Sequence, residues 1–262
     1  MMIRRRTCLS IVGAGVLVLT AHSRCQADPP AAPAVSTFAP TDDLLSLVNQ
    51  HIAQCEKALA DPTDWDAQSR VVKRDANTLV VIAQALALHD EDHQLKAGGS
   101  GLYAATQQLA AALDHATAQQ ALSQVKAAAG GEATGANTTG AADVSWTAKS
   151  ASLGPLMKQV TFQFNRLKRN TRGDRLAKQA AETTCGATLL AVIAQAVQAD
   201  THEVKDPADT DKWYQLTAAM RDASAQLRST IATGDAAATA ESLAALDKTC
   251  KSCHEVFRIK TP

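Results

Sequence analysis

The sequence predicts an all-α protein built from two tandem antiparallel four-helix bundles. Aromatic residues make up only 3% of the chain, and alternating apolar and polar residues, the pattern typical of strands, are hard to find. Apolar residues instead recur at steps of three and four, which places their side chains on one face of a helix. Short breaks rich in glycine or proline separate these segments, as expected for antiparallel helices with short loops.

The first 27 residues have the features of a secretory signal peptide. A basic start over residues 4–6 is followed by an apolar stretch over 8–21 that is too short to span a bilayer well. Small residues favour cleavage after Ala27, which would also remove Arg24 and leave 22 basic and 26 acidic residues. We therefore expect an exported protein, periplasmic or otherwise extracytoplasmic, with no membrane span and no basic patch for nucleic acid.

The first predicted bundle spans residues 41–129. It follows a proline-rich segment over 28–40, which we expect to be a flexible lead that forms no core. Its third helix is predicted to begin after the glycine-rich residues 98–101. Residues 130–145 are mostly Gly, Ala, Thr and Asn and are predicted to be a linker. The apolar stripe of the first helix consists of Leu45, Val48, Ile52, Cys55 and Leu59.

The second predicted bundle spans residues 146–262 and repeats this plan. Its first helix has an apolar stripe that includes Met157, and its third helix places Met220 in the core. The stripe of its last helix runs without a gap into two cysteines, so these are predicted to face the core. That last stripe consists of Ala240, Leu243, Leu246, Cys250, Cys253 and Phe257.

Near the C-terminus, Cys250, Cys253 and His254 form the pattern C-x-x-C-H. This pattern is the attachment signature of a c-type haem. Two thiols can add to the haem vinyl groups, and the adjacent imidazole can reach the iron. Because residues three and four apart share a helix face, all three side chains would project toward one flat cofactor, with His254 as the proximal iron ligand.

A C-x-x-C pair can also be a redox dithiol or half of a zinc site. A thioredoxin-type dithiol is expected after a strand in a βαβ context, whereas the upstream pattern here is helical. A zinc site needs four ligands, and no second C-x-x-C or H-x-x-x-H pattern is near enough to supply the rest. Together with the export signal, the motif therefore favours haem.

The stretch over 250–258, Cys-Lys-Ser-Cys-His-Glu-Val-Phe-Arg, resembles the class II cytochromes c, the cytochrome c′ family. The resemblance implies one covalent haem c inside a four-helix bundle, attached to the last helix. It also implies that Arg258 lies over the haem, near the proximal histidine or the propionates. Members of this family often form dimers through their first two helices, and a fused first bundle offers an alternative to that contact.

Aligning the first helix of the second bundle with this family, through residues 164–167, brings Met157 to the distal position above the iron. In the family, methionine there can close the sixth site and give a low-spin electron carrier, whereas an apolar residue leaves the iron open to small gases. An axial methionine also raises the reduction potential. Met157 lies on an apolar stripe, however, where methionine is a common core residue, so core packing is the alternative.

The two halves of the chain look duplicated. Residues 81–85 and 192–196 share the sequence Val-Ile-Ala-Gln-Ala at an offset of 111, and the same offset superposes the pair 102–103 on 213–214. Aligning the last helices places Ala129 opposite Cys250. The first bundle is therefore expected to lack haem and to serve as a docking surface or scaffold.

The sequence thus predicts one-electron transfer by an iron that His254 and Met157 hold, with Arg258 tuning the nearby charge. The alternatives are a gas-binding protein, open to nitric oxide or carbon monoxide, and an assembly module whose haem-free bundle docks a partner. No Ser/His/Asp or paired-carboxylate arrangement indicates an enzyme, and the redox partner is not identified.

Two weaker patterns involve cysteine and histidine residues. Cys55 and Cys185 are the only thiols left after signal cleavage and haem attachment, and an exported chain could oxidise them, although buried free thiols are common. His89 and His93 could place two imidazoles near a metal ion. The charge density between them instead favours a solvated loop.

Overall fold

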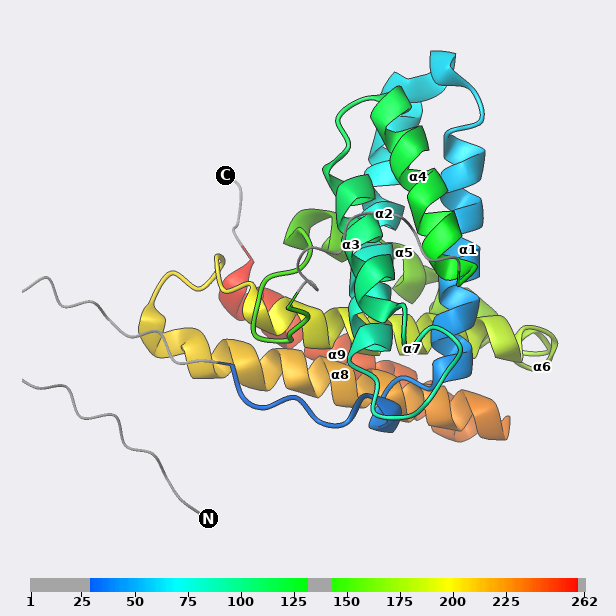
Figure 1. The fold of residues 1–262 in the computed structure, drawn as a ribbon. Coiled ribbons are helices and arrows are strands. Elements are labelled where there is room, and N and C mark those ends of the chain that lie inside the picture. Colours follow the sequence, from blue (N-terminus) through cyan, green and yellow to red (C-terminus); the bar gives the residue numbers. More distant parts are fainter. Residues whose placement is uncertain (1–28, 132–142, 259–262) are drawn as a thin grey trace, which may run out of the picture.

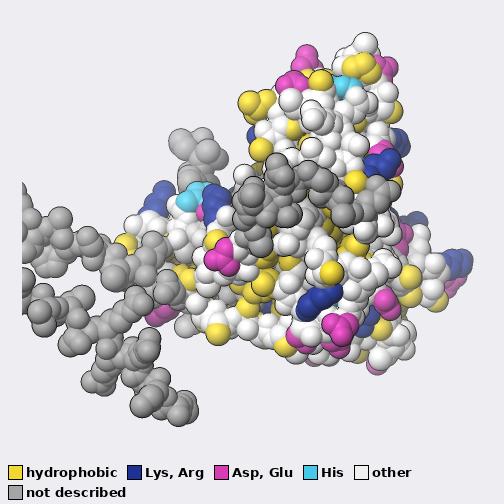
Figure 2. Space-filling model, viewed as in Figure 1, with side chains coloured by type: hydrophobic (Ala, Val, Ile, Leu, Met, Phe, Trp, Pro, Cys, Tyr) yellow, Lys and Arg dark blue, Asp and Glu magenta, His cyan; other side chains and the backbone are white. Residues whose placement is uncertain are grey.

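The structure is a computed structural model that describes residues 29–131 and 143–258. The predicted signal peptide, most of the predicted linker and the last four residues lie outside these ranges. Within them the chain forms α-helices and short 3-10 helices and contains no strand, which confirms the all-α prediction. Charged side chains of both signs are interspersed on the face seen in Figure 2.

The first four helices form an antiparallel bundle, which stands upright in Figure 1. Each helix packs against the next, and the last returns to the first. In chain order they are α1 (Thr41–Ala58), α2 (Trp65–Ala87), α3 (Gly99–Ala111) and α4 (His115–Ala129).

Helix α3 begins at Gly99, before the glycine-rich stretch ends, which corrects the predicted start after residue 101. The reason is a close approach between backbones. A Cβ atom added to Gly99 would lie 2.8 Å from the Cα of Ala87, the last residue of α2. Glycine therefore lets α3 start directly against the end of α2.

The second group of helices lies across the base of the first in Figure 1. Here α7 packs against α5 and α8, and α8 packs against α9. Gly234 ends α8 in the left-handed conformation, with φ of 72°. Asp235 then caps α9 by accepting from the backbone N–H of Ala238 at 2.9 Å. The group comprises α5 (Leu153–Asn170), α6 (Arg175–Lys178), α7 (Ala180–Ala196), α8 (Thr210–Thr233) and α9 (Ala236–Phe257).

Helix α7 is the centre of the whole fold. It packs against α5 and α8 of its own group and also against α1 and α2 of the first. By length and composition alone, the segment Ala180–Ala199 is apolar enough to cross a membrane, but 78% of its apolar window is buried inside the protein. Its apolar character is that of a core helix, and the hydrophobic core continues through both groups.

A buried carboxylate joins the two groups at α7. Asp43 of α1 is 8% exposed. Its Oδ2 accepts a hydrogen bond from Thr188 Oγ1 of α7 at 2.6 Å and one from Arg228 Nε of α8 at 3.0 Å. The first bundle is therefore fixed to two helices of the second by one charged residue.

The segment before α1 differs from the predicted flexible lead. Val35, Phe38 and Ala39 are buried in the core, and the Phe38 ring lies 6.5 Å from that of Trp146. Ser36 donates from its backbone N–H and its hydroxyl to the carboxylate of Asp90, at 2.9 and 2.5 Å. Three buried apolar residues and one serine thus anchor a segment that is otherwise rich in proline and alanine.

The connection after α2 is a loop whose charged residues 90–92 are exposed, as predicted, but its two histidines bond to the backbone. His89 is buried, and its Nε2 lies 3.0 Å from the carbonyl of Ala39. His93 Nε2 lies 3.0 Å from the carbonyl of Leu86. Each Nδ1 accepts from a backbone N–H two residues further on. With all four ring nitrogens engaged, the pair is not arranged to bind a metal ion.

Cys55 and Cys185 are both free thiols. Cys185 Sγ lies 3.9 Å from Asp43 Oδ1, whereas Cys55 follows Asp43 by twelve residues on α1, which corresponds to about 18 Å of helix. Burial raises the pKa of both thiols, that of Cys185 to about 11. The predicted alternative of a disulfide between them is therefore wrong, and both are unreactive core residues.

Candidate haem-binding site

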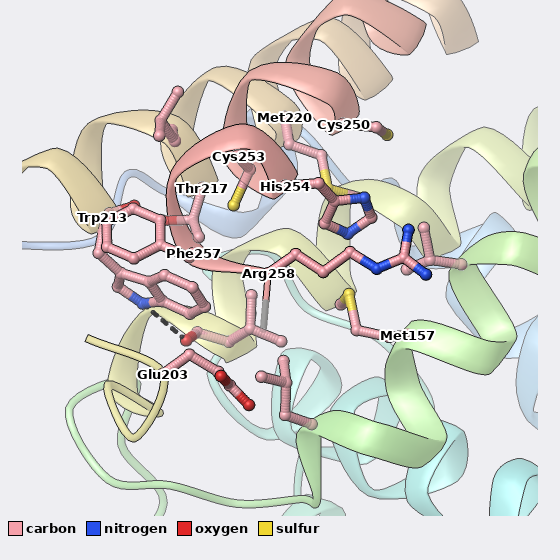
Figure 3. A pocket seen from close by; sticks show the side chains of 14 residues that line it. Met157, Glu203, Trp213, Thr217, Met220, Cys250, Cys253, His254, Phe257 and Arg258 are labelled. Atoms are coloured by element: carbon pink, nitrogen blue, oxygen red, sulfur yellow. Dashed lines mark hydrogen bonds between the residues drawn. The ribbon is translucent and has the colours of Figure 1, made fainter. Parts of the chain in front are cut away.

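A largely apolar cavity of about 280 Å³ lies among α5, α8, α9 and the loop after α7. Figure 3 shows the side chains that line it. Its volume is near the lower end of the range for small-molecule pockets. The cavity contains all five residues that the sequence singled out: Met157, Cys250, Cys253, His254 and Arg258.

Helix α9 places the C-x-x-C-H residues on the cavity wall. Because it continues to Phe257, Cys250, Cys253 and His254 lie within regular helix and share one side of it, as predicted. Both cysteines are half-buried, and His254 is more exposed. Burial raises the pKa of the Cys253 thiol to about 11, and burial followed by the Asp247 charge raises that of Cys250. Burial and then the nearby Arg258 lower the pKa of His254, which favours the neutral, ligating imidazole.

An aromatic pair holds the last turn of α9 against α8. The rings of Trp213 and Phe257 meet edge to face, with centroids 5.2 Å apart and an interplanar angle of 86°. Trp213 Nε1 donates to the carbonyl of Val197 at 3.2 Å, the dashed line in Figure 3. The sequence placed Trp213 in the third helix of the second bundle, opposite Leu102 in the internal repeat, but indicated no role for it at the site.

Two methionines reach the cavity from different helices. Met157 lies in the second turn of α5, and in the view of Figure 3 its thioether points into the cavity, as the His254 ring does from α9. Met220 lies on α8 beside α9 and is buried, as expected for a core residue, but it too lines the cavity.

Opposite charges flank the cavity. Arg258 follows the last residue of α9, and its backbone N–H donates to the carbonyl of His254 at 3.3 Å. Glu203, from the loop between α7 and α8, also lines the cavity, and its Oε1 lies 3.1 Å from His202 Nε2. The sequence indicated Arg258 but not Glu203, because no local motif marks a loop carboxylate that folding brings to a cavity.

The walls fit a flat, covalently attached haem. Two thiols and one imidazole come from a single helix, a thioether comes from another, and most of the remaining lining is apolar. Helix α5 packs mainly on α7 and α2. The ion pair between Lys168 and Asp247, at 3.6 Å, links it to α9. The cavity thus lies between two helices that are bridged rather than closely packed.

This fold and this site define a helical c-type cytochrome domain. Residues 154–258 match the family model for cytochrome c′, so this part of the chain is similar to a family whose members carry a covalent haem c. The match runs from α5 through α9, whereas α1 to α4 lie outside it. No curated protein and no solved structure matches the chain.

Proposed function

We propose that this protein is an exported cytochrome that binds one haem c in its second bundle and transfers single electrons. The observation that carries this proposal is the position of Met157, which faces the cavity from α5 while His254 faces it from α9. Histidine and methionine as axial ligands would close both iron sites and raise the reduction potential. Electron exchange would then need a redox partner but no open coordination site.

Each candidate residue has a distinct role in this proposal. Cys250 and Cys253 would form the thioether bonds that prevent loss of the cofactor, and His254 would be the proximal ligand. When bound, the haem supplies an iron that gains or loses one electron. The apolar walls exclude water and so limit the reorganisation of solvent when the iron changes charge. Arg258 places a positive charge at the cavity, which favours the reduced state.

We also propose that the two bundles arose by duplication and that only the second retains a haem site. Helices α1 and α5 have equal lengths of 18 residues, and their starts lie 112 positions apart. The starts of α3 and α8 lie 111 positions apart. Helix α4 ends at Ala129, the position aligned with Cys250, and the residues aligned with Cys253 and His254 are Glu132 and Ala133, neither of which can supply a thiol or an imidazole.

Export is supported by the signal-peptide pattern of residues 1–27 and by the typically periplasmic location of cytochromes c′. Mass analysis of the secreted protein would test it. We expect an N-terminus at Asp28 and the added mass of one haem.

The spectrum of the dithionite-reduced protein, before and after addition of carbon monoxide, tests the proposed coordination. The protein would be produced together with haem-attachment machinery. Sharp low-spin bands that barely respond to the gas are expected, because the Met157 thioether occupies the sixth site. A broad high-spin spectrum that shifts with carbon monoxide would contradict electron transfer through a closed site and would favour gas binding instead.

A further inference from the structure

The segment that leads into α5 is held by a buried glutamine of the haem-free bundle. Gln84 of α2 is 1% exposed. Its Nε2 donates to the carbonyl of Ser145 at 2.7 Å, and its Oε1 accepts from Ser150 Oγ at 2.7 Å. Both ends of one amide are therefore used to fix the path of residues 145–150 along α2.

A second buried amide, two helical turns earlier on the same face of α2, holds the residue directly before α5. Asn77 is 2% exposed. Its Nδ2 donates to the carbonyl of Lys73 at 2.7 Å, which orients the amide, and its Oδ1 accepts from the backbone N–H of Ser152 at 2.8 Å. The first bundle thus supplies a hydrogen-bond acceptor at the N-terminus of α5.

Helix α5 is poorly equipped to fix its own first turn. Ser152 occupies the N-cap position, but its side chain makes no capping hydrogen bond. A capping serine normally accepts from the backbone N–H two or three residues later. Here those residues are Gly154, which is costly to order, and Pro155, which has no N–H. The start of α5 therefore depends on contacts from outside the helix.

Met157 lies five residues after Ser152, so its direction depends on where α5 begins. A shift of one residue in the helix register rotates a side chain by about 100°, enough to turn the thioether out of the cavity. We propose that Asn77 and Gln84, in the haem-free bundle, are positioning residues that aim Met157 at the iron. The proposal rests on the proposed function, because it assumes that Met157 is the sixth ligand.

The test compares Asn77→Ala and Gln84→Ala in the haem-loaded full chain. Each substitution should raise the ratio of open, carbon monoxide-binding iron to closed iron by roughly five- to ten-fold. This is the change in a local equilibrium that the loss of one helix cap produces. Gln84→Ala provides a second route if Asn77→Ala fails to fold. The matched control is Val125→Ala, which truncates a buried residue of α4, a helix that packs on α3 and α1, and should leave the ratio unchanged.

Met157→Leu separates this inference from the proposed function. If Met157→Leu itself leaves the spectrum unchanged, the proposed ligation is wrong. If Met157→Leu opens the iron, Asn77→Ala should have no further effect in that background, since its action runs through Met157. An open site in Met157→Leu, together with a wild-type ratio in both Asn77→Ala and Gln84→Ala, would overturn the positioning role.

Hydrogen exchange in the haem-free full chain gives a readout that is independent of the iron. The backbone N–H of Ser152 should exchange faster in Asn77→Ala because it loses its acceptor, and it should keep its protection in Val125→Ala. Equal protection in Asn77→Ala and the wild type would show that Asn77 does not fix the start of α5 and would overturn the inference.

Discussion

Met157 and Met220 offer the same thioether to one cavity, but from different sides of it. Met157 faces it from α5 and Met220 from α8, the neighbour of α9. Identical chemistry at two positions makes each methionine a control for the other. The sequence distinguished the two methionines only by their positions along their helices. Helical spacing indicates which side of a helix faces the core, but it does not indicate which group lies opposite that side.

Replacing each methionine with leucine therefore tests the sixth ligand. Met157→Leu should give high-spin iron that binds carbon monoxide and has a lower reduction potential, because leucine fills the space without a sulfur. Met220→Leu should keep the low-spin spectrum. Both exchanges conserve volume and should cost less than about 1.5 kcal/mol of stability. The reverse pattern, with only Met220→Leu opening the iron, would transfer the ligand role to α8.

Asp90 is the residue whose charge anchors the segment before α1. Hydrogen bonds from the side chain and backbone of Ser36 lower its pKa to about 2. A carboxylate whose pKa is lowered by folding stabilises the folded state at pH values above its pKa in the unfolded chain, about 3.9. This stabilisation is lost as the pH falls through the pKa of the folded state. We expect residues 35–39 to undock between about pH 4 and pH 2.

Fluorescence of Trp146, whose ring packs on Phe38, should follow this undocking. Ser36→Ala removes the hydroxyl donor and should move the transition toward higher pH, because the pKa of Asp90 then rises. An acid transition that is identical in Ser36→Ala and the wild type would show that another group controls it.

At the scale of helices, the sequence predicted what depends on spacing and missed what depends on contact between elements. The stripes that include Met157 and Cys250 were found because helical periodicity is local. The start of α3 was misplaced because glycine normally weakens a helix, whereas Gly99 lies where two backbones meet. His89 and His93 were assigned to solvent because their bonding partners are backbone carbonyls, which no sequence pattern marks.

The two glycines at the start of α3 should respond oppositely to alanine. In Gly99→Ala the new Cβ would lie 2.8 Å from the backbone of Ala87, and relieving such overpacking should cost about 1–3 kcal/mol. Gly101 is also helical but has no atom near the equivalent position. Gly101→Ala should therefore stabilise by about 0.4–1 kcal/mol. Urea unfolding of both variants measures the difference, and equal effects would argue against the close approach.

At the scale of the whole molecule, the two bundles share one core. Helix α7 packs against helices of both groups, so removal of residues 41–145 would expose apolar surface of α7 that α1 and α2 now cover. Two tandem bundles could be predicted from the sequence, but their shared core could not. A helix that is apolar on all sides is expected to be buried, but its sequence does not show which helices surround it. We expect both bundles to unfold in a single transition.

Asp43 is the residue through which that union can be tested. Asp43→Ala leaves Arg228 and Thr188 without their shared acceptor, and losing a buried, charged hydrogen-bond partner should cost about 1–3 kcal/mol. The control is Asp222→Asn, which removes the charge of an exposed carboxylate that pairs with Arg221 and should change stability by less than about 1 kcal/mol. In urea, Asp43→Ala should lower the midpoint of the common transition, because the lost contact joins α1 to α7 and α8. If the transition instead separates into two in the wild type, the bundles are independent folding units and α7 does not unite them.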